Sequence, residues 1–159
     1  MHRATALVLL LLLGSVASAQ IEDLKPRGWL HLNGYTHHFD APDANDNLYG
    51  AGFTWYTQST GKLERAWEAD VFRDSGNKLC AHAGHSWIYA SRHWKAGLLA
   101  GLMYHRNFIK QDRWCVLPIA LPFVEVPLRA LSIRAYYVPP VRSRHDQQIA
   151  LQLLLPFVR

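Results

Sequence analysis

The segment Trp94–Arg106, WKAGLLAGLMYHR, alternates two kinds of side chain at every second residue. A period of two is the pattern of a β-strand whose two faces have different surroundings. Trp94 and Tyr104 lie at the two ends of its more apolar face, as aromatic residues do at the two interfaces of a membrane barrel. The segment therefore predicts a strand with one face toward lipid, while Gly97 and Gly101 on the other face leave room for a cavity.

Seven further segments show strand patterns bounded by turn residues. The eight expected strands cover residues 28–37, 48–58, 63–72, 79–90, 94–105, 114–122, 128–138 and 147–157. Each has about the length that a tilted strand needs to cross a bilayer. An even number of strands closes without an exposed edge, and long connections alternate with short ones. We expect an all-β fold, an eight-stranded antiparallel up-and-down transmembrane β-barrel, with a secreted soluble barrel as the alternative.

The first 19 residues have the features of a cleaved secretory signal peptide. A basic start precedes the apolar run Ala4–Val16, and Ala17-Ser18-Ala19 forms a small-residue cleavage site. We therefore expect residues 1–19 to be the signal and residues 20–159 one barrel domain, a monomer in the bacterial outer membrane. The formal net charge of +5 suits anionic lipid or nucleic acid. Export and aromatic richness favour lipid, so no nucleic-acid partner is expected.

The chain has two cysteines, Cys80 and Cys115. In an oxidising compartment they could form a disulfide, and two buried thiols are the other possibility. His37 and His38 look like a metal-binding pair, but neighbouring side chains on a strand face opposite ways. We expect no metal site and no cofactor.

Asp74 and Ser75 follow the third expected strand, on the side of the long loops. The first strand ends on the same side, and His31 lies on its inward face. An imidazole that takes the proton of a serine hydroxyl, and a carboxylate that orients the imidazole, together support acyl transfer. Two alternatives are an ordinary turn role for Asp-Ser-Gly and the use of His37, which is expected on the same face as His31.

Several motifs together indicate a family. They are Phe72–Lys78 (FRDSGNK), Gly50–Phe53 (GAGF), Ala83–Trp87 (AGHSW), the proline-rich segment 117–122 and Tyr137–Pro139. The number of residues between His31 and Gly50 also resembles that of the family. In these motifs the chain resembles the lipid A palmitoyltransferase (PagP) family of eight-stranded outer-membrane barrels. The likeness covers most of residues 29–157, and the motif at 72–78 is its most specific part.

The resemblance implies transfer of a fatty acyl chain, palmitate or shorter, from a phospholipid donor to lipid A as acceptor. It implies three catalytic residues: His31 as general base, Asp74 as its orienter, and Ser75 as nucleophile or oxyanion-side donor. It also implies that Gly84 and Ser86 form the floor of the acyl pocket. Because Ser86 stands where the family has glycine, its hydroxymethyl group would shorten the chain that fits.

The expected outer loops carry basic residues, for which two interpretations remain open. They are Arg106, Lys110, Arg113, Arg142 and Arg144. A solvated rim accounts for them, and so do contacts to lipid A phosphates. Two other functions are also open. One is an outer-membrane lipid hydrolase, a lipid A deacylase or phospholipase, with water as acceptor; the other is a non-catalytic surface barrel.

Overall fold

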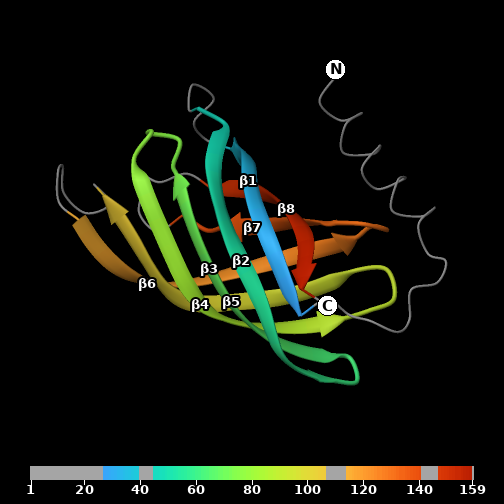
Figure 1. Ribbon diagram of the computed structural model, residues 1–159. Coiled ribbons are helices and arrows are strands. Elements are labelled where there is room, and N and C mark those ends of the chain that lie inside the picture. The colour runs from blue at the N-terminus through green and yellow to red at the C-terminus, as the bar shows by residue number, and fades with distance from the viewer. Residues whose placement is uncertain (1–26, 40–44, 107–113, 141–146, 159) are drawn as a thin grey trace.

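The computed structural model describes residues 27–39, 45–106, 114–140 and 147–158. In these ranges eight antiparallel strands follow one another around a closed barrel, and the last pairs with the first (Figure 1). The strands are β1 Gly28–His38, β2 Asn47–Thr60, β3 Leu63–Arg73, β4 Leu79–Ala90, β5 Lys95–Arg106, β6 Trp114–Pro127, β7 Ser132–Val138 and β8 Gln148–Val158. The predicted all-β, eight-stranded up-and-down barrel is confirmed.

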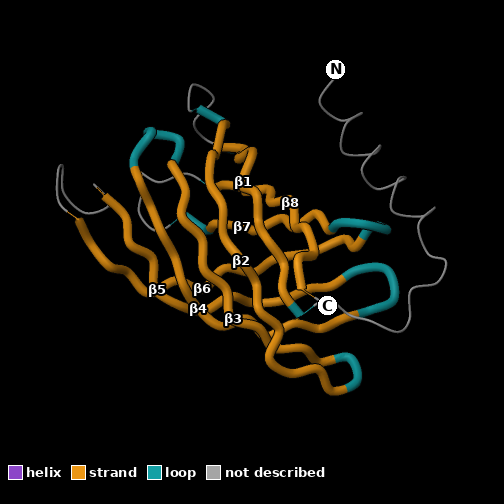
Figure 2. Tube along the Cα trace, viewed as in Figure 1, coloured by secondary structure: helices purple, strands orange, loops and turns teal. Residues whose placement is uncertain are grey.

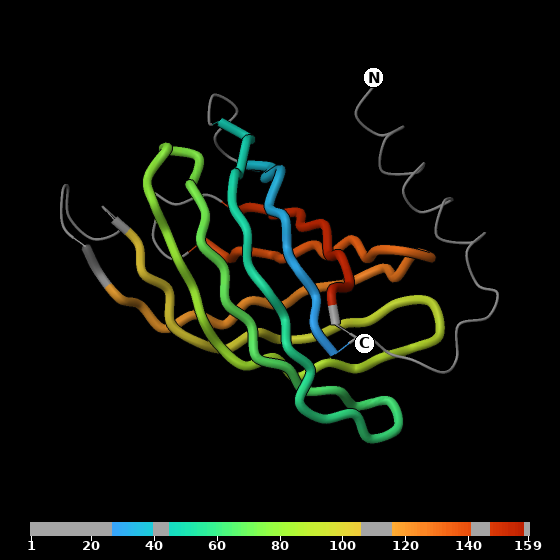
Figure 3. The backbone as a smooth tube through the Cα atoms, viewed as in Figure 1, coloured from blue at the N-terminus to red at the C-terminus, as the bar shows by residue number. Residues whose placement is uncertain are grey.

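The turns of the barrel lie at two opposite ends. The β2–β3, β4–β5 and β6–β7 turns share one end, here called the turn end, and the β3–β4 turn lies at the other end, here called the mouth (Figure 2). Figure 3 follows the chain through this path. The expected signal, residues 1–19, lies outside the described residues. Among those described, no helix is long and apolar enough to cross a membrane.

Alternation along each strand separates an inner from an outer surface, as the sequence predicts. On β5, Leu99 is fully buried, whereas Leu98 and Leu102 are 42% and 57% exposed. Many large apolar side chains face outward in the same way. They include Leu30, Leu32, Phe53, Trp55, Trp67, Val71, Leu79, Trp87, Leu98, Leu102, Val116 and Val124, here called the outer band. So many exposed large apolar side chains on one barrel surface are unusual for a soluble monomer.

The strand β1 contains a bulge at Gly34, where the register shifts in both of its ladders. A bulge adds one residue to one strand and so reverses which side chains point inward. His31 is buried before the bulge and His38 is buried after it. The expectation that His37 shares the face of His31 is therefore wrong. The His37 ring lies edge-on to Phe39 instead.

The strand β6 continues to Pro127, beyond the predicted end at residue 122, and β7 begins at Ser132 rather than at 128. Among the described residues, the β6–β7 ladder pairs only residues 123–127 with 132–136. The mouth half of β6 pairs with β5 alone, and this half contains Pro118 and Pro122. Proline has no N–H to donate, so it is tolerated where a strand has no partner on one side.

The inside of the barrel toward the turn end is filled by a network of charged and hydroxyl groups. Arg134 is fully buried and donates to Glu68 Oε2 and Glu125 Oε2, both at 2.7 Å. Tyr136 donates to Glu68 Oε2 at 2.5 Å, and Ser86 donates to Glu68 Oε1 at 2.5 Å. Buried charges are tolerated when they are paired in this way. We call these five residues the polar plug.

The two cysteine positions lie on either side of β5. Cys80 is paired with His105 in the β4–β5 ladder, and His105 is paired with Cys115 in the β5–β6 ladder. Two strand spacings correspond to about 9.6 Å between Cα atoms, whereas disulfides span about 4.4–6.8 Å. The backbone therefore disfavours the disulfide. Cys80 is buried, and the side chain of Cys115 lies outside what the structure describes.

Candidate functional site

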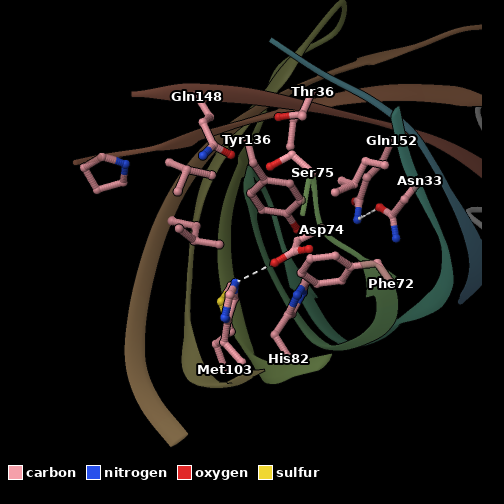
Figure 4. Close-up of a pocket in the computed structure, with 16 residues that line it drawn as sticks. Asn33, Thr36, Phe72, Asp74, Ser75, His82, Met103, Tyr136, Gln148 and Gln152 are labelled. Atoms are coloured by element: carbon pink, nitrogen blue, oxygen red, sulfur yellow. Dashed lines mark hydrogen bonds and ion pairs between the residues drawn. The ribbon is translucent and has the colours of Figure 1, made fainter. Parts of the chain in front are cut away.

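A cavity of about 250 Å³ lies inside the barrel near the mouth (Figure 4). Most of its exposed surface is apolar, although half of the residues that line it are polar or charged. The residues that line it are Asn33, Thr36, Leu48, Phe72, Asp74, Ser75, His82, Met103, His105, Leu121, Tyr136, Val138, Pro139, Gln148, Ala150 and Gln152. A cavity that combines apolar surface with placed polar groups is the usual form of a small-molecule site.

The β3–β4 turn places Asp74 and Ser75 on the cavity wall. Asp74 Oδ1 accepts the backbone N–H of Lys78 at 2.7 Å, and the Asp74 N–H donates to the Lys78 carbonyl at 2.9 Å. Asn77 adopts a left-handed φ of 59°, which asparagine tolerates better than most residues. The turn is thus closed by the Asp74 side chain and by backbone hydrogen bonds. The Asp-Ser pair has the turn chemistry that its sequence suggests, and it also faces the cavity.

The imidazole beside Asp74 is that of His105, from the end of β5. Asp74 Oδ2 lies 3.1 Å from His105 Nε2, and their side chains are 18% and 19% exposed. The dashed line from Asp74 in Figure 4 marks this contact. Partial burial raises the pKa of the Asp74 carboxyl, but hydrogen bonds from His105 and from the Lys78 backbone outweigh burial and lower that pKa below its ordinary value. Asp74 is therefore a carboxylate at neutral pH.

The structure does not bring His31 to Asp74. His31 points inward, as predicted, but it is completely buried below the cavity. Its Nδ1 donates to Asp70 Oδ2 at 3.0 Å, and its Nε2 lies 2.5 Å from Thr54 Oγ1. Asp70 precedes Asp74 by four residues, about 13 Å along an extended strand. Both ring nitrogens of His31 therefore already have partners within the barrel wall.

Asp70 connects His31 to the cavity through a second histidine. His82 lines the cavity, and its Nε2 lies 3.3 Å from the same Asp70 Oδ2 that His31 contacts. The other oxygen, Asp70 Oδ1, accepts from Asn33 at 3.1 Å and from Gln152 at 3.2 Å. The carboxylate is thus enclosed by donors, which fixes both imidazoles that contact it.

Neither Gly84 nor Ser86 lines the cavity. Both are on inward-facing positions of β4, but the Ser86 hydroxyl is bonded to Glu68 within the polar plug. Tyr136 is the member of the polar plug that borders the cavity, because its ring lines the cavity while its hydroxyl donates to Glu68 (Figure 4).

The side chains expected to contact lipid A phosphates are not among those that the structure describes. Lys110, Arg113, Arg142 and Arg144 lie outside the described residues, and only the backbone of Arg106, at the end of β5, is described.

Sequence reasoning missed His82, His105 and Asp70. Each occupies an inward position of a strand that the sequence predicts, so alternation alone could have placed it inside the barrel. It could not have paired His105 with Asp74, because that contact depends on the register of two ladders between β3 and β5.

No protein-family model matches the chain, and no curated protein matches it in sequence. The site must therefore be interpreted from its own chemistry. It offers a carboxylate–imidazole pair, a neighbouring hydroxyl and an apolar cavity.

Proposed function

We propose that this protein is an outer-membrane acyltransferase that moves a fatty acyl chain from a phospholipid to lipid A. The observation that carries the proposal is the position of Asp74, Ser75 and His105 on the wall of one apolar cavity, inside a barrel with an apolar outer surface.

The outer band supports a membrane location. Strands of 11–14 residues, such as β1 and β2, are long enough to cross a bilayer at a tilt. A closed barrel also pairs each strand with both of its neighbours, as lipid requires of backbone groups, and the mouth half of β6 is the exception among the described residues. The signal-like segment at 1–19 agrees with export.

The apolar cavity lining supports a hydrocarbon ligand. Leu48, Phe72, Met103 and Leu121 provide apolar surface next to the polar groups of the turn. The volume of about 250 Å³ lies just below the range of about 300–1,000 Å³ that is common for small-molecule sites. This modest size favours an acyl chain shorter than palmitate.

The short β6–β7 ladder supports entry of a lipid from the side. Val138 and Pro139, at the end of β7, line the cavity. The facing half of β6 has no β7 partner among the residues described. A lipid chain could pass here without breaking ladder hydrogen bonds, because among the described residues the β6–β7 ladder ends at the Phe123–Tyr136 pair.

The three polar side chains have complementary roles in the proposed reaction. In the tautomer that donates Nε2–H to Asp74, His105 keeps a lone pair on Nδ1 and can act as general base. His105 Nδ1 is buried in the structure, so the step requires the Ser75 hydroxyl to turn toward this nitrogen when the lipid binds. The imidazole then takes the Ser75 proton as Oγ attacks the ester carbonyl, and the lysophospholipid leaves with that proton. A lipid A hydroxyl then attacks the acyl-serine, and its proton restores Ser75 through the same imidazole. If Ser75 only donates to the oxyanion, the lipid A hydroxyl attacks the ester directly.

Single variants test these roles in purified protein given phospholipid and lipid A in detergent micelles. Ser75→Ala, Asp74→Asn and His105→Gln should each lower the transfer rate by about 10²–10⁴-fold, the usual contribution of acid–base catalysis. His37→Gln, which removes an imidazole beside Phe39 on β1, should leave the rate unchanged.

The variant His31→Gln tests which histidine is the general base: His105, as the geometry suggests, or His31, as the resemblance implies. We expect it to reduce the rate less than His105→Gln, because His31 acts at most through Asp70 and His82. If His31→Gln alone abolishes transfer, His31 is the base and the assignment of His105 is wrong. If folded Ser75→Ala, Asp74→Asn and His105→Gln all retain the full rate, this site does not catalyse the reaction.

A further inference from the structure

A buried thiol completes a group of three possible metal ligands at the mouth. One ligand atom each from Asp74, Cys80 and His105 lie within 4.8 Å of one another. The Asp74 Oδ2 to His105 Nε2 distance of 3.1 Å is the closest contact given for this group. For comparison, zinc bond lengths of about 2.0–2.3 Å place tetrahedral ligand atoms about 3.3–3.7 Å apart. Shifts of the order of 1 Å would therefore bring the three atoms to bonding distance.

Three separate elements fix these side chains, so the group does not depend on one flexible segment. Cys80 is the second residue of β4 and is paired with His105 in the β4–β5 ladder, where paired side chains on one face are about 5 Å apart. Asp74 is held by the Lys78 backbone at the preceding turn. The Cys80 Sγ lies 3.6 Å from the Lys78 carbonyl, which anchors the thiol to the same turn.

The chemistry of the three groups selects among metals. A thiolate with an imidazole and a carboxylate is a borderline-soft donor set, which suits Zn²⁺ and not the oxygen-seeking Mg²⁺ or Ca²⁺. Three protein ligands leave one tetrahedral position for water or another ligand. Because Asp74 and His105 line the cavity, an ion can enter from there and its open position can face it.

From this arrangement we infer that Asp74, Cys80 and His105 form a zinc site with one open coordination position at the mouth of the cavity. The inference does not depend on acyl transfer. Its consequence for the reaction does rest on the proposed function: a metal on His105 and Asp74 occupies the pair that would move the proton, so bound zinc would inhibit transfer.

The test uses the whole barrel, folded in detergent, with Cys115→Ser as the background so that Cys80 is the only thiol. Co²⁺ replaces Zn²⁺ as the probe because it gives visible bands in tetrahedral sites and a near-ultraviolet band when sulfur binds it. We expect one equivalent of Co²⁺, both sets of bands, and displacement by Zn²⁺.

Two variants on this background identify the ligands. Cys80→Ser should remove the sulfur band, and His105→Gln should weaken Co²⁺ binding at least tenfold. His85→Gln is the matched control, since its imidazole packs between Trp67 and Trp87, away from the cavity, and it should change neither property. Far-ultraviolet circular dichroism verifies that each variant is folded.

Three results would overturn the zinc site. They are no stoichiometric Co²⁺ binding by the folded protein, no sulfur band in the Cys115→Ser background, and an affinity that His105→Gln leaves unchanged. None of these depends on an acyl-transfer assay, so failure of the zinc site and failure of the proposed function can be told apart.

Discussion

Gly52 is the residue that lets His31 reach Asp70. The three lie in one row across β1, β2 and β3, with Gly52 in the middle. A Cβ at Gly52 would lie 2.2 Å from the Ala69 carbonyl oxygen and 2.3 Å from Asp70 Oδ1. Because there is no side chain between them, an imidazole and a carboxylate two strands apart come within 3.0 Å. The glycine thus determines where His31 is held.

Gly52→Ala should therefore destabilise the barrel by about 1–3 kcal/mol, the usual cost of overpacking against atoms that cannot move away. Gly34→Ala is the control, because no atom lies within 4 Å of its Cβ position and its φ is not in the left-handed region. It should change the free energy of unfolding by less than about 1 kcal/mol. Urea unfolding followed by tryptophan fluorescence measures both, and equal costs would contradict this explanation.

At the scale of strands, alternation was sufficient to place eight strands and each inward face that it predicts, except at the end of β1. It could not show the bulge at Gly34, because a glycine within a strand pattern fits a straight strand equally well. The bulge exchanges the faces of His37 and His38. Contacts between strands, such as Asp74 with His105, depend on register, which one strand pattern does not contain. The sequence therefore indicated Asp74 and Ser75 on the cavity wall, but it indicated His31 where the structure has His105.

The prolines of β6 lead to a prediction for individual amides. A proline cannot donate within a ladder. The backbone N–H positions of the even-numbered residues of β6, which include Pro118 and Pro122, should therefore point toward β7 and not toward β5. The amides of Val116 and Ala120 should then exchange rapidly, whereas those of Leu117, Ile119 and Leu121, which face β5, should exchange slowly. Amide hydrogen exchange followed by NMR in micelles measures this difference. Equal protection of both sets would show that the β6–β7 ladder continues to the mouth.

At the scale of the whole molecule, the barrel has three regions with different chemistry. Charged groups are paired in the polar plug at the turn end, the cavity lies toward the mouth, and the outer band covers the outside. Apolar side chains on the outer surface are unfavourable in water and favourable in lipid, so this surface is compatible with an outer-membrane protein. The proposed reaction uses this arrangement, because the acyl chain would pass from lipid into the apolar cavity while its ester stays near the polar groups of the mouth.

Leu102→Arg tests whether the outer band faces lipid. An arginine near the middle of a membrane-facing surface costs about 2–4 kcal/mol, whereas an exposed substitution on a soluble barrel changes stability by about 0.5 kcal/mol or less. We expect the larger cost in phospholipid vesicles. Gln58→Arg, at an exposed position near the turn end of β2, should have little effect. Similar small effects of both variants would favour the soluble barrel.

The most direct test is the mass of lipid A after incubation with the protein in vesicles whose phospholipids carry deuterated acyl chains of several lengths. The proposal predicts lipid A that is heavier by one deuterated chain, with chains shorter than palmitate preferred and an equal amount of lysophospholipid formed. Lipid A of unchanged mass, with folded protein present, would contradict it. Deuterated fatty acid released into solution would then identify a hydrolase instead.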